Sequence, residues 1–146
     1  MKGTVMPTIT KIEEIMTKGV FTISLNDTIN EADRIMKDEK VRHVPVVDNG
    51  KFIGLITERT LMEFTLRQIY DFDENIEESG RNKIGDFQQV MAKDIHLVYP
   101  EDSVKKAVEI MVKKKADCLP VVDWDNNLTG IITIYDILLY LNKKLN

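Results

Sequence analysis

The chain has 146 residues, of which 43% are hydrophobic and 30% charged, and its formal net charge is −4. This balance is typical of a folded globular protein and excludes a mainly disordered chain. The acidic excess argues against nucleic acid as a partner, since phosphate backbones bind concentrated basic surfaces. Cys118 is the single cysteine, so the chain cannot form an internal disulfide or a zinc site built on several cysteines.

Targeting and membrane segments are not expected. No apolar run approaches the roughly 18 residues that a membrane-spanning helix needs. Residues 1–16 carry charges and no long apolar stretch, unlike a signal peptide. We therefore expect a cytoplasmic protein with no membrane partner.

The chain begins with an expected N-terminal arm at residues 1–10. Thr10 with Glu13 then has the spacing of a capping box, which predicts a short helix. Apolar and β-branched residues at 20–23 predict the first strand.

The next helix is predicted from a start signal and an apolar face. Thr28 followed by Glu31 has the spacing of a second capping box. Four apolar side chains then recur at helical spacing, namely Ile29, Ala32, Ile35 and Met36. We expect these four side chains to face a core.

A hairpin and a closing helix follow. Strands are predicted at 44–47 and 52–57, because Asn49-Gly50 between two β-branched runs is a strong hairpin signal. A helix is predicted over 61–70. Residues 71–85 are then expected to form an acidic linker with five acidic side chains: Asp71, Asp73, Glu74, Glu77 and Glu78. The pattern favours a solvated segment, and the alternative is a surface for a basic partner.

The chain repeats itself. A shift of 75 residues, from 45 to 120, aligns two Pro-Val-Val-Asp runs, at 45–48 and 120–123. One further residue of shift aligns two glycine-hydrophobic-hydrophobic-threonine runs, at 54–57 and 130–133. The two repeats are assigned to 11–70 and 86–146.

The second repeat is expected to follow the order of the first. Its helix is capped by Asp102-Ser103 and has an apolar face made of Val104, Ala107, Val108 and Met111. The expected strands are at 95–98, 119–122 and 128–133, with a turn at 124–127 and a last helix at 135–141. Each repeat is thus strand-helix-strand-strand-helix, which predicts an α/β (α+β) fold. Because one unit of about 60 residues is marginal alone, we expect the two to pack as one pseudo-twofold domain.

These runs, in this order and twice, resemble the CBS domain pair, or Bateman module. The resemblance covers about residues 11–142. It implies tandem CBS repeats that bind adenosyl compounds in clefts between them: AMP, ADP, ATP, S-adenosylmethionine and, in some members, NAD or cyclic dinucleotides. It also implies regulation of an enzyme, channel or transporter. Since the chain carries little else, we expect a stand-alone regulatory module with a separate target protein.

The resemblance implies a ribose site at Thr133 and Asp136. In the family, the motif Gly-hydrophobic-hydrophobic-Thr-x-x-Asp holds the ribose, and Gly130, Thr133 and Asp136 keep it whole. A carboxylate can accept hydrogen bonds from both ribose hydroxyls. In the first repeat, Thr60 stands where the aspartate belongs, so the two clefts are expected to differ. The alternative is that Asp136 only caps its helix.

Resemblance to the gamma subunit of AMP-activated protein kinase implies a phosphate site. The matching residues for the Asp136 cleft are all basic, namely Arg42, His43 and Arg59. Those for the other cleft carry no positive charge, namely Asp117, Cys118 and Tyr135. We therefore expect one competent nucleotide site per chain. The alternative is that Arg42 and His43 satisfy helix-end carbonyls or pair with acids.

The adenine is expected against a short set of mostly strand residues, namely Ile95, His96, Leu97 and Val121. For His96 the alternative is an exposed strand histidine. Asp117 is a further carboxylate expected near the ribose. Because like charges repel, it would favour S-adenosylmethionine or metal-bound ATP over a bare polyphosphate.

Three classes of function compete. The first is an adenosyl-ligand sensor, and the second is a dimeric adaptor with degenerate, ligand-free clefts. CBS pairs commonly form homodimers, and the last helix offers Leu138, Leu139 and Leu141 for such an interface. An enzyme lacks support, because no nucleophile–base motif or glycine-rich phosphate loop is visible. We expect no catalytic residue, catalytic cofactor or metal.

Overall fold

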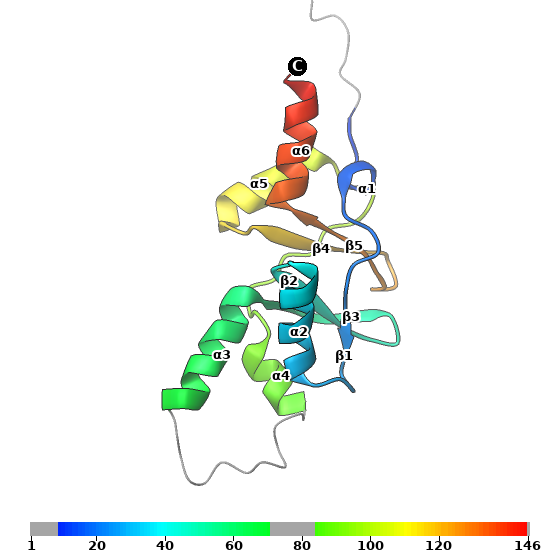
Figure 1. Ribbon diagram of the computed structural model, residues 1–146. Helices are drawn as coiled ribbons and strands as arrows, with labels where there is room; N and C mark the ends of the chain where they lie inside the picture. Colours follow the sequence, from blue (N-terminus) through cyan, green and yellow to red (C-terminus); the bar gives the residue numbers. More distant parts are fainter. Residues whose placement is uncertain (1–8, 71–83, 146) are drawn as a thin grey trace, which may run out of the picture. The chain divides into compact units, whose positions relative to one another are not determined.

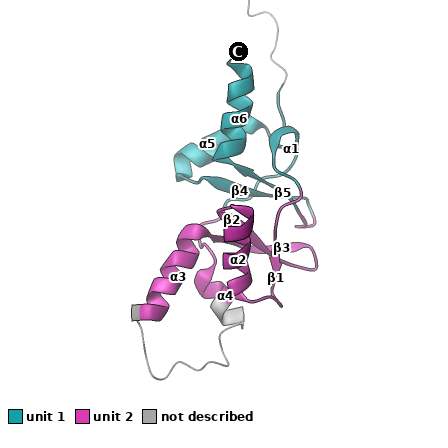
Figure 2. Ribbon diagram, viewed as in Figure 1, with its two compact units in different colours: residues 1–18, 96–124, 129–146 teal, residues 19–95, 125–128 magenta. Residues whose placement is uncertain are grey.

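The structure is a computed structural model that describes residues 9–70 and 84–145. It divides into two compact units, each made from separate stretches of the chain (Figure 2). Unit 1 comprises Met1–Lys18, His96–Trp124 and Thr129–Asn146, and unit 2 comprises Gly19–Ile95 and Asp125–Leu128. The acidic side chains of the predicted linker lie at 71–83, outside the described residues.

Unit 2 is built on a three-stranded sheet in the order β1 (Ile23–Ser24), β2 (His43–Asp48) and β3 (Lys51–Thr57). Strand β1 pairs parallel to β2, and β2 pairs antiparallel to β3. Asn49 and Gly50 join β2 to β3 with φ values of 52° and 81°. Positive φ at both central positions is the geometry of a type I′ hairpin turn, so the hairpin predicted from Asn-Gly is confirmed.

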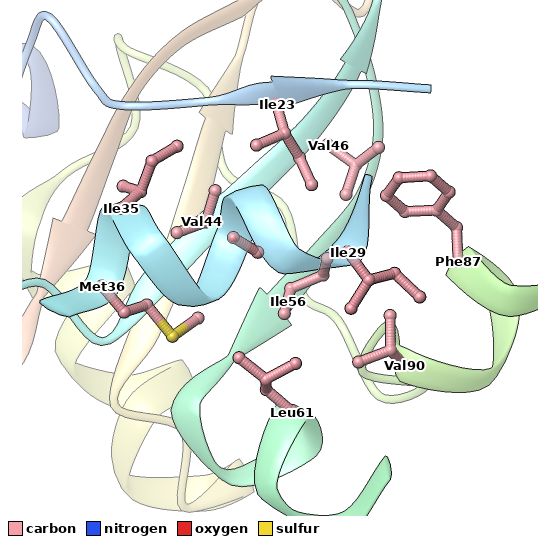
Figure 3. Packing of buried hydrophobic residues seen from close by; sticks show 11 residues of the cluster. Ile23, Ile29, Ile35, Met36, Val44, Val46, Ile56, Leu61, Phe87 and Val90 are labelled. Atoms are coloured by element: carbon pink, nitrogen blue, oxygen red, sulfur yellow. The ribbon is translucent and has the colours of Figure 1, made fainter. Parts of the chain in front are cut away.

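Three helices pack with this sheet: α2 (Ile29–Glu39), α3 (Glu58–Tyr70) and α4 (Ile84–Val90) (Figure 1). All four apolar residues predicted on one face of α2 are buried. They share a core with residues of β2, β3 and α3. Helix α4 was not predicted, yet it contributes Phe87 and Val90, which lie beside Ile29 (Figure 3).

The start of α2 differs from the prediction in one respect. Thr28 is the N-cap residue, but its side chain makes no capping hydrogen bond. The Glu31 carboxylate instead accepts a hydrogen bond from Nε of Arg34 at 3.1 Å. The capping box predicted here is therefore wrong, because a cation one turn along the helix engages the glutamate.

Unit 1 is built on a two-stranded sheet of β4 (Cys118–Val122) and β5 (Leu128–Thr133). Helices α5 (Val104–Lys114) and α6 (Ile134–Lys144) lie on the same side of this sheet (Figure 1). Val104, Ala107 and Met111 of α5 are buried, and Val108 is partly buried against the same core. The Ser103 hydroxyl caps α5 by accepting a hydrogen bond from the Lys106 N–H at 3.0 Å, as predicted.

The strand predicted at 95–98 is reduced to one bridge, between Val98 and Val121. Two backbone hydrogen bonds hold it, from Val98 N–H to Pro120 and from Val122 N–H to Val98. Of the four residues, only Val98 is fully buried, and Leu97 is exposed. Val98 is therefore the residue of this segment that pairs with β4.

The N-terminal segment packs with unit 1, whose strands and longer helices belong to the second repeat. Helix α1 (Ile12–Ile15) places Ile12 in the core, with 0% exposure. The Ile12 N–H donates to the Asp102 carbonyl at 2.8 Å. The predicted capping box is displaced by one residue, since the N-cap is Lys11 and its N–H donates to Glu14. Thr10 instead shares a hydrogen bond with the Tyr140 hydroxyl at 3.0 Å.

The lengths and hydropathies of the described helices can be compared with those of membrane-spanning helices. Within residues 9–70 and 84–145, none is both long enough and apolar enough to cross a bilayer.

Candidate functional site

Thr133 and Asp136 lie where β5 gives way to α6. Thr133 is the N-cap of α6, and its Oγ1 accepts a hydrogen bond from the Asp136 N–H at 3.3 Å. In return, Asp136 Oδ2 accepts hydrogen bonds from the Thr133 N–H at 2.9 Å and from the Thr133 hydroxyl at 3.2 Å. Asp136 therefore does cap its helix, through Oδ2.

The other carboxylate oxygen has a different donor. Asp136 Oδ1 accepts a hydrogen bond from the hydroxyl of Thr17 at 2.9 Å. Asp136 is 7% exposed and is the one charged side chain in the core of the described segments. Burying a carboxylate is costly unless it is hydrogen-bonded. A carboxylate offers about four acceptor positions, so the three donors leave about one position, on Oδ1.

The first repeat shows that a helix cap of this kind does not need a carboxylate. There the Thr57 N–H donates to Thr60 Oγ1 at 2.9 Å, and the Thr60 N–H donates to Thr57 Oγ1 at 3.0 Å. Thr60 thus makes the same pair of backbone contacts at the start of α3 that Asp136 makes at the start of α6. The Oδ1 atom of Asp136 and its negative charge are additional to what the cap requires.

Arg42, His43 and Arg59 come together at one end of the β2–β3 hairpin in unit 2. His43 pairs with Thr57 in the sheet, and the Arg42 carbonyl accepts a hydrogen bond from the Glu58 N–H at 2.9 Å. Arg59 is the next residue, in the first turn of α3. Its exposed side chain lies 3.5 Å from the Glu63 carboxylate. An exposed pair of this kind contributes at most about 1 kcal/mol, so it presents little obstacle to an incoming anion.

The equivalent end of the β4–β5 strands in unit 1 has a carboxylate, Asp117, at the position that Arg42 has in unit 2. Here the Asp117 carbonyl accepts the hydrogen bond from the Ile134 N–H at 3.0 Å. Burial raises the pKa of the Cys118 thiol well above its usual value, and the charges of Asp117 and Asp136 raise that pKa further. Both carboxylates therefore act on the same thiol, and none of the three matched positions here, Asp117, Cys118 and Tyr135, carries a positive charge.

The residues predicted to contact the adenine differ in the unit they belong to and in burial. Ile95 belongs to unit 2, whereas His96, Leu97 and Val121 belong to unit 1. The Val121 side chain is buried in the core and its carbonyl accepts a hydrogen bond from the Thr129 hydroxyl at 3.1 Å. His96 is half-buried and lies outside any strand, so it is not an exposed strand histidine.

The predicted site residues therefore fall into two groups. Thr133 and Asp136 are together in unit 1, and Arg42, His43 and Arg59 are together in unit 2. Among residues 9–70 and 84–145, no cluster of three or more histidine, cysteine, aspartate or glutamate side chains could hold a metal ion.

Thr17 was not predicted from the sequence. The signal was present, because the same 75-residue shift places Thr17 on Ala92. The position carries a hydroxyl only in the chain's first copy of this segment, which packs against Asp136. Its partner is 119 residues away, so no local motif connects the two.

Comparison with known proteins identifies the family. A model of the CBS domain matches residues 12–67 and 84–143. The chain is 32% identical over 126 residues to the CBS domain-containing protein YhcV of Bacillus subtilis, covering 86% of this chain and 81% of YhcV. It is 34% identical over 129 residues to inosine-5'-monophosphate dehydrogenase of Methanocaldococcus jannaschii, covering 88% of this chain. The chain spans only 23% of that enzyme's length, so the match carries no activity over.

Solved structures agree on the fold. The CBS domain pair of protein MJ0100, in complex with 5'-methylthioadenosine and S-adenosyl-L-methionine, has a TM-score of 0.75 at 24% identity, covering 94% of this chain and 99% of that one. CBSX2 in complex with AMP has a TM-score of 0.76 at 19% identity, with the same two coverages. Both are likenesses of fold. Together with the family match over both repeats, they show that this chain belongs to the CBS-domain family and is a tandem CBS pair.

Proposed function

We propose that this chain is a regulatory CBS pair that binds an adenosyl compound, AMP, ADP, ATP or S-adenosylmethionine, and signals to a separate target protein. The ribose would meet Asp136, and the phosphates or an equivalent group would meet Arg42, His43 and Arg59. The observation that carries the proposal is the Oδ1 atom of Asp136. It is buried, charged and additional to the helix cap, which Thr60 achieves with a hydroxyl.

The adenosyl class is supported by two structures of similar fold. MJ0100 was solved with 5'-methylthioadenosine and S-adenosyl-L-methionine, and CBSX2 with AMP. All three compounds carry a ribose attached to adenine. The common chemistry fits a carboxylate acceptor, because charge-assisted hydrogen bonds from hydroxyls are strong.

The charge of this chain divides the ligands into two groups. Three basic side chains favour AMP, ADP or ATP, since one guanidinium group can donate hydrogen bonds to two oxygens of a phosphate. Asp117 beside Cys118 favours S-adenosylmethionine, whose sulfonium carries a positive charge. Arg42→Ala should therefore weaken ATP binding more than adenosine binding, as measured by calorimetric titration. Equal losses for both would contradict a phosphate role for Arg42.

A thermal-shift panel tests the proposal as a whole. AMP, ADP, ATP, S-adenosylmethionine, NAD and cyclic di-AMP would each be added to the wild-type protein and to Asp136→Thr. A ligand at 100 times its dissociation constant adds about 2.7 kcal/mol of stability, which raises the midpoint by about 5–10 °C for a chain of this length. We expect a shift with at least one adenosyl ligand, lost in Asp136→Thr.

The choice of threonine matters, because Thr60 shows that threonine can make the cap. Thr60→Ala is the matched control, since it alters the equivalent cap in the first repeat. It should lower the starting midpoint without removing the ligand-induced shift. No shift with any ligand in the wild-type protein would overturn the proposal.

An adaptor role is the second candidate, and exposed apolar side chains on two helices favour it. On α6 they are Leu138, Leu139 and Leu141, and on α3 they are Met62, Leu66 and Ile69. Exposed apolar patches mark interaction surfaces. We propose that α6 contributes to a homodimer, which is compatible with either role.

A further inference from the structure

The N-terminal segment is fixed against β5 by its backbone. The Thr17 N–H donates to the Ile131 carbonyl at 2.8 Å, and the Ile131 N–H donates to the Thr17 carbonyl at 3.0 Å. A Cβ on Gly130 would lie 2.8 Å from the Thr17 carbonyl oxygen, so the two backbones approach as closely as glycine permits. This contact holds Thr17 where its hydroxyl lies 2.9 Å from Asp136 Oδ1.

Unit 2 shows that attachment of this segment to its strand does not need the hydroxyl. There Ala92 stands at the position of Thr17, and its N–H makes the equivalent bond to the Leu55 carbonyl at 2.8 Å. Alanine therefore suffices to attach the segment to its strand. In unit 2 the carboxylate is also replaced, by Thr60. The hydroxyl and the carboxylate occur together in one unit and are replaced together in the other.

We infer that Thr17 is a positioning residue for Asp136, which sets the carboxylate for a ligand hydroxyl. This inference rests on the proposed function. The hydrogen bond from Thr17 fixes the rotation of the carboxylate, whose Oδ2 is held by Thr133. With about four acceptor positions on a carboxylate, the three bonds leave about one for a ligand. Asp136 then accepts one ribose hydroxyl while these bonds persist, in place of the two expected from the sequence.

The consequence is a selectivity that depends on Thr17. A ligand whose ribose hydroxyl donates to Asp136 Oδ1 is favoured over the deoxy analogue that lacks this hydroxyl. The deoxy analogue leaves the buried Oδ1 atom with one hydrogen-bond donor fewer. Without Thr17, Oδ1 loses the donor that fixes it and only Oδ2 stays held by Thr133, so that preference falls. A purely structural role for Thr17 would weaken all ligands alike.

The test is a set of calorimetric titrations with AMP, 2'-deoxy-AMP, 3'-deoxy-AMP and S-adenosylmethionine. Thr17→Ala copies Ala92, the residue at this position in unit 2, and Thr17→Ser keeps a hydroxyl. Thr10→Ala is the matched control, since it removes a side-chain hydrogen bond from the same segment, to Tyr140. The same titrations on Asp136→Thr, alone and combined with Thr17→Ala, complete a double-mutant cycle.

We expect Thr17→Ala to lower the affinity for a ligand with an intact ribose by about tenfold. The affinity for one of the two deoxy analogues should fall less, because that analogue lacks the hydroxyl that Asp136 binds. In Thr17→Ser and Thr10→Ala the affinities should stay within about twofold of wild type. Adding Thr17→Ala to Asp136→Thr should cause no further loss. Unchanged affinity in Thr17→Ala, or the same loss with and without Asp136, would overturn the positioning role and leave the proposed function standing. Absence of binding by the wild-type protein would overturn the proposed function and this inference together.

Discussion

At the scale of single residues, the informative feature is a pair of helix caps that differ in one side chain. Thr60 and Asp136 make equivalent contacts at the starts of α3 and α6, yet only Asp136 has a second oxygen, which the N-terminal segment engages. The sequence motif predicted that Asp136 is special, whereas the alternative predicted only a cap. The structure shows the cap and an additional buried acceptor together.

The two glycines before these caps provide a residue-scale prediction. A Cβ at Gly130 would lie 2.8 Å from the backbone oxygen of Thr17, whereas at Gly54 the near atoms belong to the Met91 side chain. Backbone cannot move aside as a flexible methionine can. We expect Gly130→Ala to lower the free energy of unfolding by about 1–3 kcal/mol, and Gly54→Ala to lower it less. Urea unfolding of both variants measures the difference, and a larger loss in Gly54→Ala would contradict the close approach of Thr17 to β5.

At the scale of elements, the N-terminal segment is part of the core of unit 1. Ile12 is fully buried, whereas Ile9 is 72% exposed. We expect Ile12→Ala to lower the free energy of unfolding by about 2–5 kcal/mol, as is usual for deletion of a buried isoleucine side chain. Ile9→Ala is the control, with a change within about 0.5 kcal/mol. Chemical denaturation measures the free energy of unfolding of both variants. Equally small losses in Ile12→Ala and Ile9→Ala would mean that the segment does not pack into the core.

The helix starts give a second prediction at this scale. Ser103 caps α5 with its side chain, whereas Thr28 at the start of α2 makes no such bond. Ser103→Ala should lower the free energy of unfolding by about 1 kcal/mol, and Thr28→Ala should lower it less. Both values follow from thermal or urea unfolding of the two variants. A greater loss in Thr28→Ala would show that its hydroxyl caps α2 in solution.

Elements whose signal is local were predicted well from the sequence. The Asn49-Gly50 turn and the apolar face of α2 depend on residues close together in the chain, and both are found. Strand β5 was predicted with its observed bounds, Leu128–Thr133. Features that depend on distant partners were missed. Helix α4 is stabilised by Phe87 in a core made mostly by earlier elements, and Thr17 finds its partner through tertiary structure alone.

At the scale of the whole molecule, the two repeats differ in charge where they correspond in sequence. Unit 2 carries Arg42, His43 and Arg59, whereas the corresponding positions of unit 1 are Asp117, Cys118 and Tyr135. The sequence could predict this asymmetry, because the repeat aligns each position with its counterpart. It could not predict that residues 9–18 join the unit of the second repeat, since that exchange is determined by packing.

The oligomeric state is the prediction that belongs to this scale. Leu138 on α6 is 56% exposed and lies among other exposed leucines, whereas Val112 on α5 is 74% exposed without such neighbours on its helix. We expect Leu138→Glu to convert a homodimer to a monomer, and Val112→Glu to leave the dimer intact. Light scattering coupled to size-exclusion chromatography measures the mass. A wild-type mass of one chain, or a dimer that survives Leu138→Glu, would contradict a role for Leu138 at the interface.

The most direct test of the central claim is to measure the stability and the ligand affinity of Asp136→Thr on the same protein preparation. Calorimetric titration with AMP and with S-adenosylmethionine gives the affinity, and urea unfolding gives the stability. We predict that stability stays within about 1 kcal/mol of wild type, because threonine makes the cap, while affinity falls tenfold or more. Undiminished affinity in a well-folded Asp136→Thr protein would contradict the claim and would leave Asp136 as a helix cap only.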